Sequence, residues 1–384
     1  MTILLTGAPG NKTDVLIHLK GLYEAVFESP LATYSCGNEL GDVVSRHDYN
    51  PRRLPHMRRS VVQGFRSGIP AGCALSLARQ KANGAIHSVV ETPLTEYSDT
   101  SIEDTFEDDR VFDVLAENPP AMPIERVVCS IDDPRQVLKR LSGSTIHHDY
   151  DTDDLKVERI LQWQYEEVKK AKRLAKHYTP DKRALIVPRH EAVEATIKLL
   201  VDPESPVFYT GFALTHALKN PNLMKRVEMD IFKLRFMGAV LTPIIMADVG
   251  PRTRAEEIYT IKRDYGFVEE ADVVFGIFPE DVPSKGFEDE FNHARYIGKT
   301  TVLIHPKKDR SPFGRPTYHF TSMAEFISAL YGPKEKYPEL AFLVPRDAPT
   351  LASRRYDGLP ICKGVAVSDE ELAALEKSLE QPAG

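Results

Sequence analysis

Short apolar runs alternate along this chain with longer segments whose apolar residues recur every three or four positions. The short runs have the composition of strands buried on both faces, and the longer segments have the periodicity of helices. In the first half, the predicted strands are Thr2–Thr6, Ala85–Val90, Arg126–Ile131 and Ala184–Val187. The predicted helices there are Asp14–Phe27, Arg58–Arg66, Ala71–Ala82, Pro134–Leu141, Val157–His177 and Glu191–Leu200. Strands that alternate with helices favour an α/β fold with a doubly wound parallel sheet.

The same pattern then starts again. The stretch Asp202–Pro206 is rich in Pro and acidic residues and is typical of a linker. After it, the predicted strands are Val207–Thr210, Ala239–Pro243, Asp272–Phe278 and Thr300–Ile304. The predicted helices are Leu223–Met237, Arg254–Tyr265, Phe287–Ile297 (with Gly298 as the C′ residue) and Ser322–Leu330.

A chain of 384 residues is long enough for two such domains. We therefore expect one α/β domain in residues 1–202, a second in residues 203–332, and an irregular C-terminal extension in residues 333–384.

Composition and charge exclude several classes of function. The formal net charge of −7 argues against a protein that binds nucleic acid through its phosphate backbone. No window reaches the roughly 18 apolar residues of a membrane span, so no membrane partner is expected. The four cysteines are scattered and form no CxxC pair, so neither a disulfide framework nor a zinc site is predicted. We expect a soluble protein of the cytoplasm.

The second half contains the motif with the clearest chemistry. The apolar strand Ala271–Phe278 leads into the loop Pro283–Gly286, which opens a helix that carries Glu290. Ligands bind at the carboxyl ends of strands in open α/β sheets. A helix N-terminus favours anions, so the loop could hold a phosphate and the helix could keep a carboxylate ionised. A carboxylate beside C1′ of a sugar can stabilise or attack the cation that forms when a glycosidic bond breaks. In the alternative interpretation, an acidic residue in the first turn of a helix only stabilises the N-terminus of that helix.

The segments Gly286–Ala294 and Gly298–Ile304, with the strand before them, resemble the nucleoside 2-deoxyribosyltransferase family. This resemblance implies a flavodoxin- or Rossmann-type domain in which Glu290 is the nucleophile. It implies that Asp264, in the pair Arg263-Asp264, handles the proton on the base. It also implies that Tyr209 and Gly211, in the first strand and turn, bind the sugar.

One position indicates a branch of that family. Transferases of this family often carry Asp six residues before the nucleophile, where this chain has Ser284. The change resembles the 2′-deoxynucleoside 5′-monophosphate N-glycosidases, in which the Ser binds the 5′-phosphate and water replaces the acceptor base. The resemblance implies that Ser284 and Gly286 bind the substrate, and that no cofactor is needed. It also implies a homodimer or higher homo-oligomer, in which Ser311–Arg315 could reach a neighbouring site.

The first half contains a glycine turn between a strand and a helix. Thr6–Thr13 resembles the P-loop of nucleotide kinases, in which backbone amides, a Lys and a Thr hydroxyl hold phosphates and Mg²⁺. The candidate nucleotide-binding residues are Gly7, Gly10, Lys12 and Thr13. The loop is one residue short of the usual spacing, so a degenerate P-loop kinase-like domain is favoured, with ATP and Mg²⁺ as possible ligands. Glu91 is the candidate Mg²⁺ carboxylate.

Two further features have ordinary structural interpretations. The His/Asp segment His147–Asp151 lacks a third ligand at metal spacing and is interpreted as a loop, so no metal site is predicted. The helix Val157–His177 carries a run of mixed charges interpreted as a solvated face, and its Trp163 is expected in a core or an interface.

The sequence thus predicts a nucleotide N-glycosidase that cleaves or exchanges the base–sugar bond of a nucleoside 5′-monophosphate. The first alternative is a bifunctional enzyme with an active kinase domain. The second is a non-catalytic nucleotide sensor or scaffold in which both pockets bind and neither turns over.

Overall fold

The structure is a computed structural model. It describes residues 1–7, 13–47, 49–50, 59–98, 101–105, 112–113, 123–143, 157–242, 254–282, 284–307, 315–330 and 336–343. The chain divides into two compact units: unit 1 comprises Met1–Pro203 and Asp248–Arg263, and unit 2 comprises Glu204–Ala247 and Asp264–Gly384. The division near Pro203 falls in the linker-like stretch, whereas the grouping of 248–263 with unit 1 rests on contacts that no sequence pattern indicates.

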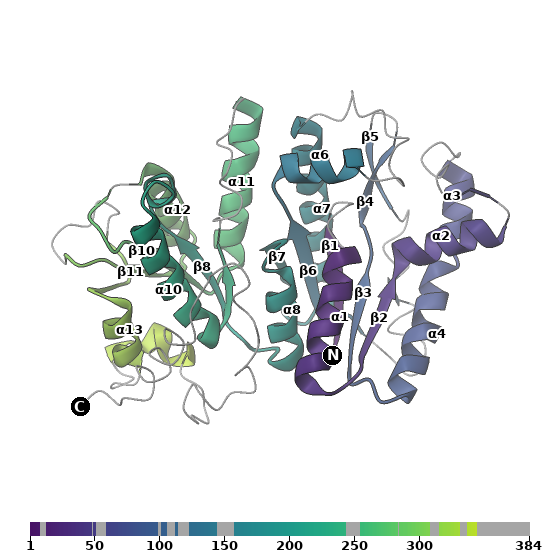
Figure 1. Ribbon diagram of the computed structural model, residues 1–384, viewed down its shortest axis with the longest axis horizontal. Coiled ribbons are helices and arrows are strands. Elements are labelled where there is room, and N and C mark those ends of the chain that lie inside the picture. Colours follow the sequence, from purple (N-terminus) through teal and green to yellow (C-terminus); the bar gives the residue numbers. More distant parts are fainter. Residues whose placement is uncertain are drawn as a thin grey trace. The chain divides into compact units, whose positions relative to one another are not determined.

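Unit 1 is built on a five-stranded parallel sheet in the order β2-β3-β1-β6-β7 (Figure 1). The strands are β1 (Thr2–Gly7), β2 (Leu31–Ser35), β3 (His87–Glu91), β6 (Arg126–Ile131) and β7 (Ala184–Pro188). The helices are α1 (Thr13–Phe27), α2 (Cys36–Arg46), α3 (Arg59–Arg66), α4 (Ile69–Ala82), α6 (Pro134–Gly143), α7 (Val157–Tyr178) and α8 (Ala192–Val201). Helices α1 and α8 cover one face and α4 and α7 pack on the other, which explains why the strands are apolar along their whole length.

A small antiparallel hairpin follows β3 in unit 1. It consists of β4 (Thr95–Ser98) and β5 (Ser101–Asp104). Helix α7 contacts both β4 and the strands of the main sheet. The hairpin, β2 and α2 are not predicted from the sequence. Strand β2 and the hairpin strands have only four or five residues each, too few to show a clear period.

Unit 2 is built on a second five-stranded parallel sheet, in the order β12-β11-β10-β8-β9 (Figure 1). The strands are β8 (Val207–Gly211), β9 (Ala239–Leu241), β10 (Val273–Ile277), β11 (Thr300–Ile304) and β12 (Tyr318–Phe320). The helices are α9 (Leu214–Ala217), α10 (Pro221–Met237), α11 (Arg254–Glu270), α12 (Lys285–Tyr296) and α13 (Met323–Leu330), with a 3₁₀ helix, η5, at Pro338–Leu343. In chain order the strands run 2-1-3-4-5, a doubly wound arrangement whose switch point lies between β8 and β10.

Successive residues of β8 point to opposite faces of this sheet, and each face has its own cover. Phe208 belongs to the core under α10, α13 and η5, together with Phe275 and Phe326. Tyr209 points to the other face, where its ring stacks on Phe267 of α11. The Glu290-bearing helix α12 packs against β10 and β11.

Two predicted boundaries in unit 2 are wrong. The sequence predicts that the helix from Arg254 ends at Tyr265, but α11 continues to Glu270 because Phe267 and Val268 are fully buried. The sequence predicts an irregular extension from residue 333, but Leu340 and Leu343 of η5 are buried in the core of unit 2. Among the described residues, no helix combines the length and the apolar composition that crossing a bilayer requires.

Candidate active site

The carboxyl ends of β8 and β10 meet at the switch point of unit 2, and helix α12 begins beside them. Gly211 ends β8 and lies in register with Gly276 of β10. A Cβ at Gly211 would lie 2.0 Å from Cδ2 of Phe287, and one at Gly276 would lie 2.7 Å from its Cε1. The Phe287 ring therefore lies directly on the two glycines, which brings the first turn of α12 close to the sheet.

This packing gives a second reason for a glycine at position 211, besides the one inferred from the sequence. The prediction places Gly211 in a sugar-binding turn, whereas in the structure its missing side chain makes room for Phe287. The paired glycine, Gly276, is a residue that the sequence reasoning missed. A glycine inside an otherwise apolar strand was the available signal, since it often marks a close approach by another group.

The predicted nucleophile, Glu290, is held by Tyr209. The Tyr209 hydroxyl donates a hydrogen bond to Glu290 Oε2 at 2.7 Å. The Tyr209 ring is fully buried against Phe267, with 6.2 Å between ring centroids. Tyr209 therefore contacts the Glu290 carboxylate through its hydroxyl, while its ring belongs to the buried interior of unit 2.

Two aromatic side chains beside Glu290 were not predicted. Burial raises the pKa of the Tyr265 hydroxyl above its usual value, and the negative charges of Asp289 and Glu290 raise it further. The Tyr265 ring stacks on His293 of α12, with 4.1 Å between centroids and nearly parallel planes. His293 Nε2 lies 3.6 Å from Glu269 Oε1. The sequence offered one indication of His293: it comes three residues after Glu290, on the same face of the helix.

Asp264 is half-buried in the middle of α11, one residue before Tyr265. Successive side chains of a helix diverge by about 100°. The Asp264 carboxylate is therefore carried on the helix face next to the one that presents Tyr265 to α12.

Ser284 occupies the N-cap position of α12. Its backbone is extended, but its hydroxyl makes no capping hydrogen bond, while its carbonyl accepts from Glu288 N at 2.9 Å. Gly286 follows in the first turn and is exposed, and a Cβ added to it would have no atom within 4 Å. A serine hydroxyl at a helix N-terminus that is not used as a cap is suited to bind an anion.

In unit 1, the glycine turn of the predicted P-loop begins at Gly7. Its φ of 152° and a distance of 2.3 Å from a Cβ to Ser130 O require glycine. Thr13 is the first residue of α1, and Gly10 and Lys12 lie outside the described residues. Glu91, the candidate Mg²⁺ carboxylate, ends β3 and accepts a hydrogen bond from Ser35 Oγ at 2.5 Å.

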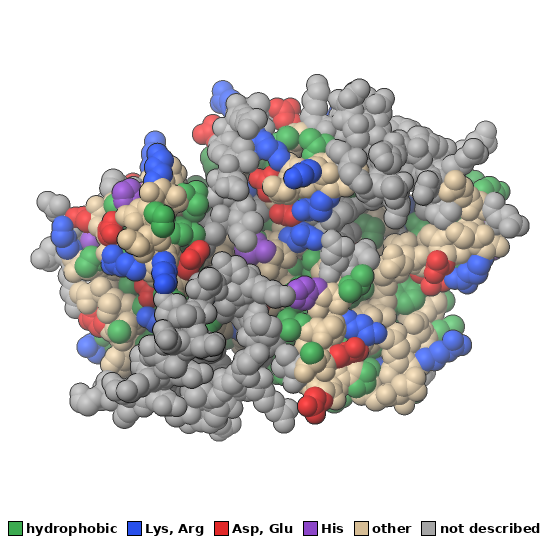
Figure 2. All heavy atoms as spheres, in the orientation of Figure 1, with side chains coloured by type: hydrophobic (Ala, Val, Ile, Leu, Met, Phe, Trp, Pro, Cys, Tyr) green, Lys and Arg blue, Asp and Glu red, His purple; other side chains and the backbone are tan. Residues whose placement is uncertain are grey.

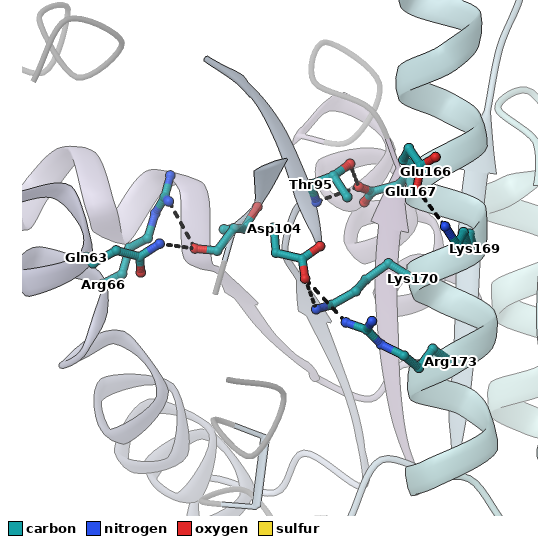
Figure 3. A network of polar contacts seen from close by, with 10 residues as sticks. Gln63, Arg66, Thr95, Asp104, Glu166, Glu167, Lys169, Lys170 and Arg173 are labelled. Carbon is teal, nitrogen blue, oxygen red and sulfur yellow. Dashed lines mark hydrogen bonds and ion pairs between the residues drawn. The ribbon is translucent and has the colours of Figure 1, made fainter. Parts of the chain in front are cut away.

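The backbone N–H of Gly7 is bound by a carboxylate from the same chain, Glu167 of α7. Glu167 is fully buried. It also accepts hydrogen bonds from the Thr6 hydroxyl, from Leu94 N at 2.9 Å, and from Thr95 N and Oγ1 at 2.7 and 2.5 Å. Figure 3 shows this carboxylate reaching from α7 to the start of β4. It ties the end of β1 to the hairpin.

The predicted solvated face of α7 is therefore wrong in part. Glu166 and Lys169 form an exposed ion pair, but Glu167 and Lys170 are buried. Lys170 Nζ pairs with Asp104 Oδ2 of β5 at 2.7 Å, and this contact also lies over the hairpin (Figure 3). Trp163 is buried as expected, and its indole N–H donates to Thr95 O at 3.2 Å.

The described residues contain no group of three His, Cys, Asp or Glu side chains arranged to hold a metal ion. The segment His147–Asp151 lies outside them, as does most of Ser311–Arg315. Cys36, Cys73 and Cys129 are buried and form no disulfide with one another.

The sequence matches no protein-family model, and it has no significant match among curated proteins.

Proposed function

We propose that unit 2 is a nucleotide N-glycosidase that uses Glu290 as its nucleophile. The observation that carries this proposal is the Tyr209–Glu290 hydrogen bond at the switch point of a doubly wound sheet. Ligands of such sheets bind at that point. The Ser284 hydroxyl lies at the start of the same helix and makes no capping hydrogen bond, so it supplies a hydrogen-bond donor for the 5′-phosphate.

In this mechanism Tyr209 binds Oε2 of Glu290, and Oε1 attacks C1′ of the bound sugar. The C1′–N bond breaks as the C1′–O bond forms, and the electron pair leaves with the base, to which Asp264 delivers or relays a proton. Water then attacks C1′ and gives up a proton to Asp264, and the C1′–O bond to Glu290 breaks, which releases Glu290 as a carboxylate. A base could take the place of water, which would give transfer rather than hydrolysis.

Ser284 favours a monophosphate substrate. Its hydroxyl and the N–H groups of the first turn of α12 supply donors to the phosphate oxygens, and the helix N-terminus favours the negative charge. Gly286 leaves this turn open, because no neighbouring atom lies near the position of a side chain there.

For unit 1 we propose nucleotide binding or a scaffold role rather than phosphoryl transfer. The Gly7 N–H, the first amide of the glycine turn, donates to Glu167 at 3.1 Å. An amide that is occupied in this way does not contribute to a phosphate cradle. A bifunctional kinase that uses ATP and Mg²⁺ stays the alternative, and phosphorylated product from ATP and a nucleoside would favour it.

The test is chromatographic detection of free base after incubation of the purified chain with ribo- and deoxyribonucleoside 5′-monophosphates. We expect Glu290→Gln to lower base release on the order of 10³-fold or more, as loss of a nucleophile does. Glu288→Gln is the matched control, because Glu288 lies on the same helix but on another face. Base release that is unchanged in a folded Glu290→Gln variant would refute the mechanism. Binding without any base release would favour the sensor alternative.

A further inference from the structure

The loop between β10 and α12 carries two consecutive carboxylates, Glu280 and Asp281, that are held by different elements. Glu280 faces α9 and α10: Arg226 pairs with it at 3.4 Å, and His216 Nε2 lies 3.8 Å from it. Arg226 also donates to Pro279 O at 3.0 Å. Figure 2 shows Lys, Arg and His side chains close to Asp and Glu side chains on the described surface of unit 2. The first half of the loop is therefore tied to α10.

Asp281 is held by the residues that follow β11. Lys307 Nζ pairs with Asp281 Oδ2 at 2.9 Å, and His305 Nε2 lies 3.6 Å from Asp281 Oδ1. The two basic groups thus lie beside different oxygens of one carboxylate. Together they tie the second half of the loop to the carboxyl end of β11.

His305 is a rigid anchor for this contact, because the residue is fully buried and fixed at several atoms. Its backbone N–H donates to Phe320 O of β12 at 2.9 Å, and its carbonyl accepts from His319 Nε2 at 2.9 Å. Its ring Nδ1 accepts from Lys307 N at 3.0 Å. With the backbone and one ring nitrogen held, Nε2 keeps one orientation, toward Asp281.

The loop and the body of α12 are positioned by separate contacts. Asp281 lies three positions before Ser284, the residue whose hydroxyl makes no capping hydrogen bond. Glu290 is held farther along the helix by Tyr209 and by the packing of Phe287 on the glycine pair. A change at Asp281 can therefore displace Ser284 while Glu290 stays in place.

We propose that Asp281 is a positioning residue, which places Ser284 to bind the 5′-phosphate and so selects nucleoside 5′-monophosphates over nucleosides. This proposal rests on the proposed glycosidase function. The charge of Asp281 opposes the binding of a phosphate, since like charges repel. Any help that Asp281 gives to phosphate binding must therefore come from the position of the loop, and this fixes the sign of the expected effect.

The test is the kinetics of base release by Asp281→Asn, with the four 2′-deoxynucleoside 5′-monophosphates and the matching nucleosides as substrates. We expect KM for a monophosphate to rise about tenfold, with kcat within about twofold and kcat/KM for the nucleoside unchanged. A lower KM for the monophosphate would show that only the charge of Asp281 acts. An equal loss with both substrates would show a general structural role. Either result would overturn the proposal.

Glu280→Gln is the matched control, because it removes the same charge one residue earlier while Arg226 still holds Pro279 O. Its exposed pairs contribute little, so KM for the monophosphate should not rise. His305→Asn should raise that KM as Asp281→Asn does, and the double variant should raise it no further, because the two residues act through one contact. Circular dichroism checks the fold of each variant. An equal rise in Glu280→Gln, or additive rises in the double variant, would contradict the assignment.

Calorimetric titration with 2-deoxyribose 5-phosphate separates this proposal from the glycosidase function, because the probe has the sugar and the phosphate but no base to release. Asp281→Asn should bind it about tenfold more weakly than the wild-type chain does. If no chain released base, the glycosidase function would fail, yet weaker binding by Asp281→Asn would still support the positioning role. Equal affinity of the two chains, including no binding by either, would overturn the positioning role even where base release is intact.

Discussion

At the scale of single residues, the candidate active site depends on side chains that are missing as well as on those that are present. Gly211 and Gly276 lie side by side on neighbouring strands, and the Phe287 ring occupies the space above them. Phe287 is also buried against Phe291, with 5.1 Å between ring centroids. Because Gly211 and Gly276 have no side chains, Phe287 can pack on the sheet, and this contact sets the position of the helix that carries Glu290.

A methyl group at Gly211 should disturb this packing. Because it would lie 2.0 Å from the Phe287 ring, we expect Gly211→Ala to lower the free energy of unfolding by about 1–3 kcal/mol. Urea denaturation measures the change. The control is Gly286→Ala in the same helix as Phe287, where a methyl group meets no atom.

Gly286→Ala should be neutral or stabilise the protein by up to about 1 kcal/mol, because alanine is the better helix former. If Gly211→Ala proved as harmless as Gly286→Ala, the close contact between Phe287 and the two glycines would be wrong.

Some residues of the candidate site could be predicted from the sequence, and others could not. Glu290 and Ser284 could be selected because a strand, a loop and a helix start are local patterns. Tyr265 and His293 could not, because their stacking depends on how α11 packs beside α12. Asp264 was selected by resemblance, and its neighbour Tyr265 is the residue whose pKa responds to Glu290.

At the scale of elements, Glu167 joins three parts of unit 1. Its carboxylate accepts hydrogen bonds from the end of β1 and from the start of β4, while its backbone belongs to α7. The other strand of the hairpin is held at the same end: Arg66 and Gln63 of α3 donate to Thr105 O, next to Asp104, at 2.9 and 3.2 Å (Figure 3). Both strands of the hairpin are therefore fixed by polar contacts at its open end, although the hairpin adds no strand to the main sheet.

Glu167→Gln should destabilise unit 1 strongly. The amide group would place a donor against the N–H groups of Gly7, Leu94 or Thr95, so we expect a loss of about 3 kcal/mol. Chemical denaturation checks the value. Glu166→Gln is the matched control on the same helix, because its exposed pair with Lys169 contributes only about 0.5 kcal/mol or less.

An equal and small effect of both changes would show that the Glu167 contacts do not hold the hairpin. A large effect of Glu166→Gln would instead indicate that the charge of α7 matters more than the burial of one carboxylate.

Most elements could be predicted from the sequence, and so could several of their ends. Strand β6 begins and ends as predicted, and β1, α1 and α7 do so within one residue. Helix α11 extends five residues beyond its predicted end, because Phe267 and Val268 gain burial that the local pattern does not reveal. Strand β12 has only three residues, Tyr318–Phe320, and is too short to show a period.

At the scale of the whole molecule, the division into two units predicts two regions that open separately. We expect Glu167→Gln to speed hydrogen exchange in β1, β3 and residues 254–263, and Gly211→Ala to speed it in β8, β10 and residues 264–270. Mass spectrometry of peptides reports both regions in one sample. The sharpest readout is α11, whose two parts belong to different units.

Exchange that rises equally in both sheets of either variant would show that the chain opens as one unit. Gly286→Ala provides the baseline, because no contact is lost in that variant.

The sequence by itself determined the α/β class, the two series of strands and helices, and the helix start that carries Glu290. These features repeat over a few residues, so their physical cause lies in local periodicity and turn chemistry. Only the tertiary structure decided that Glu167 is buried, that Phe287 lies on a pair of glycines, and that Tyr265 stacks on His293. Those outcomes arise between segments far apart in the chain, where packing and burial select one partner among many that the local pattern allows.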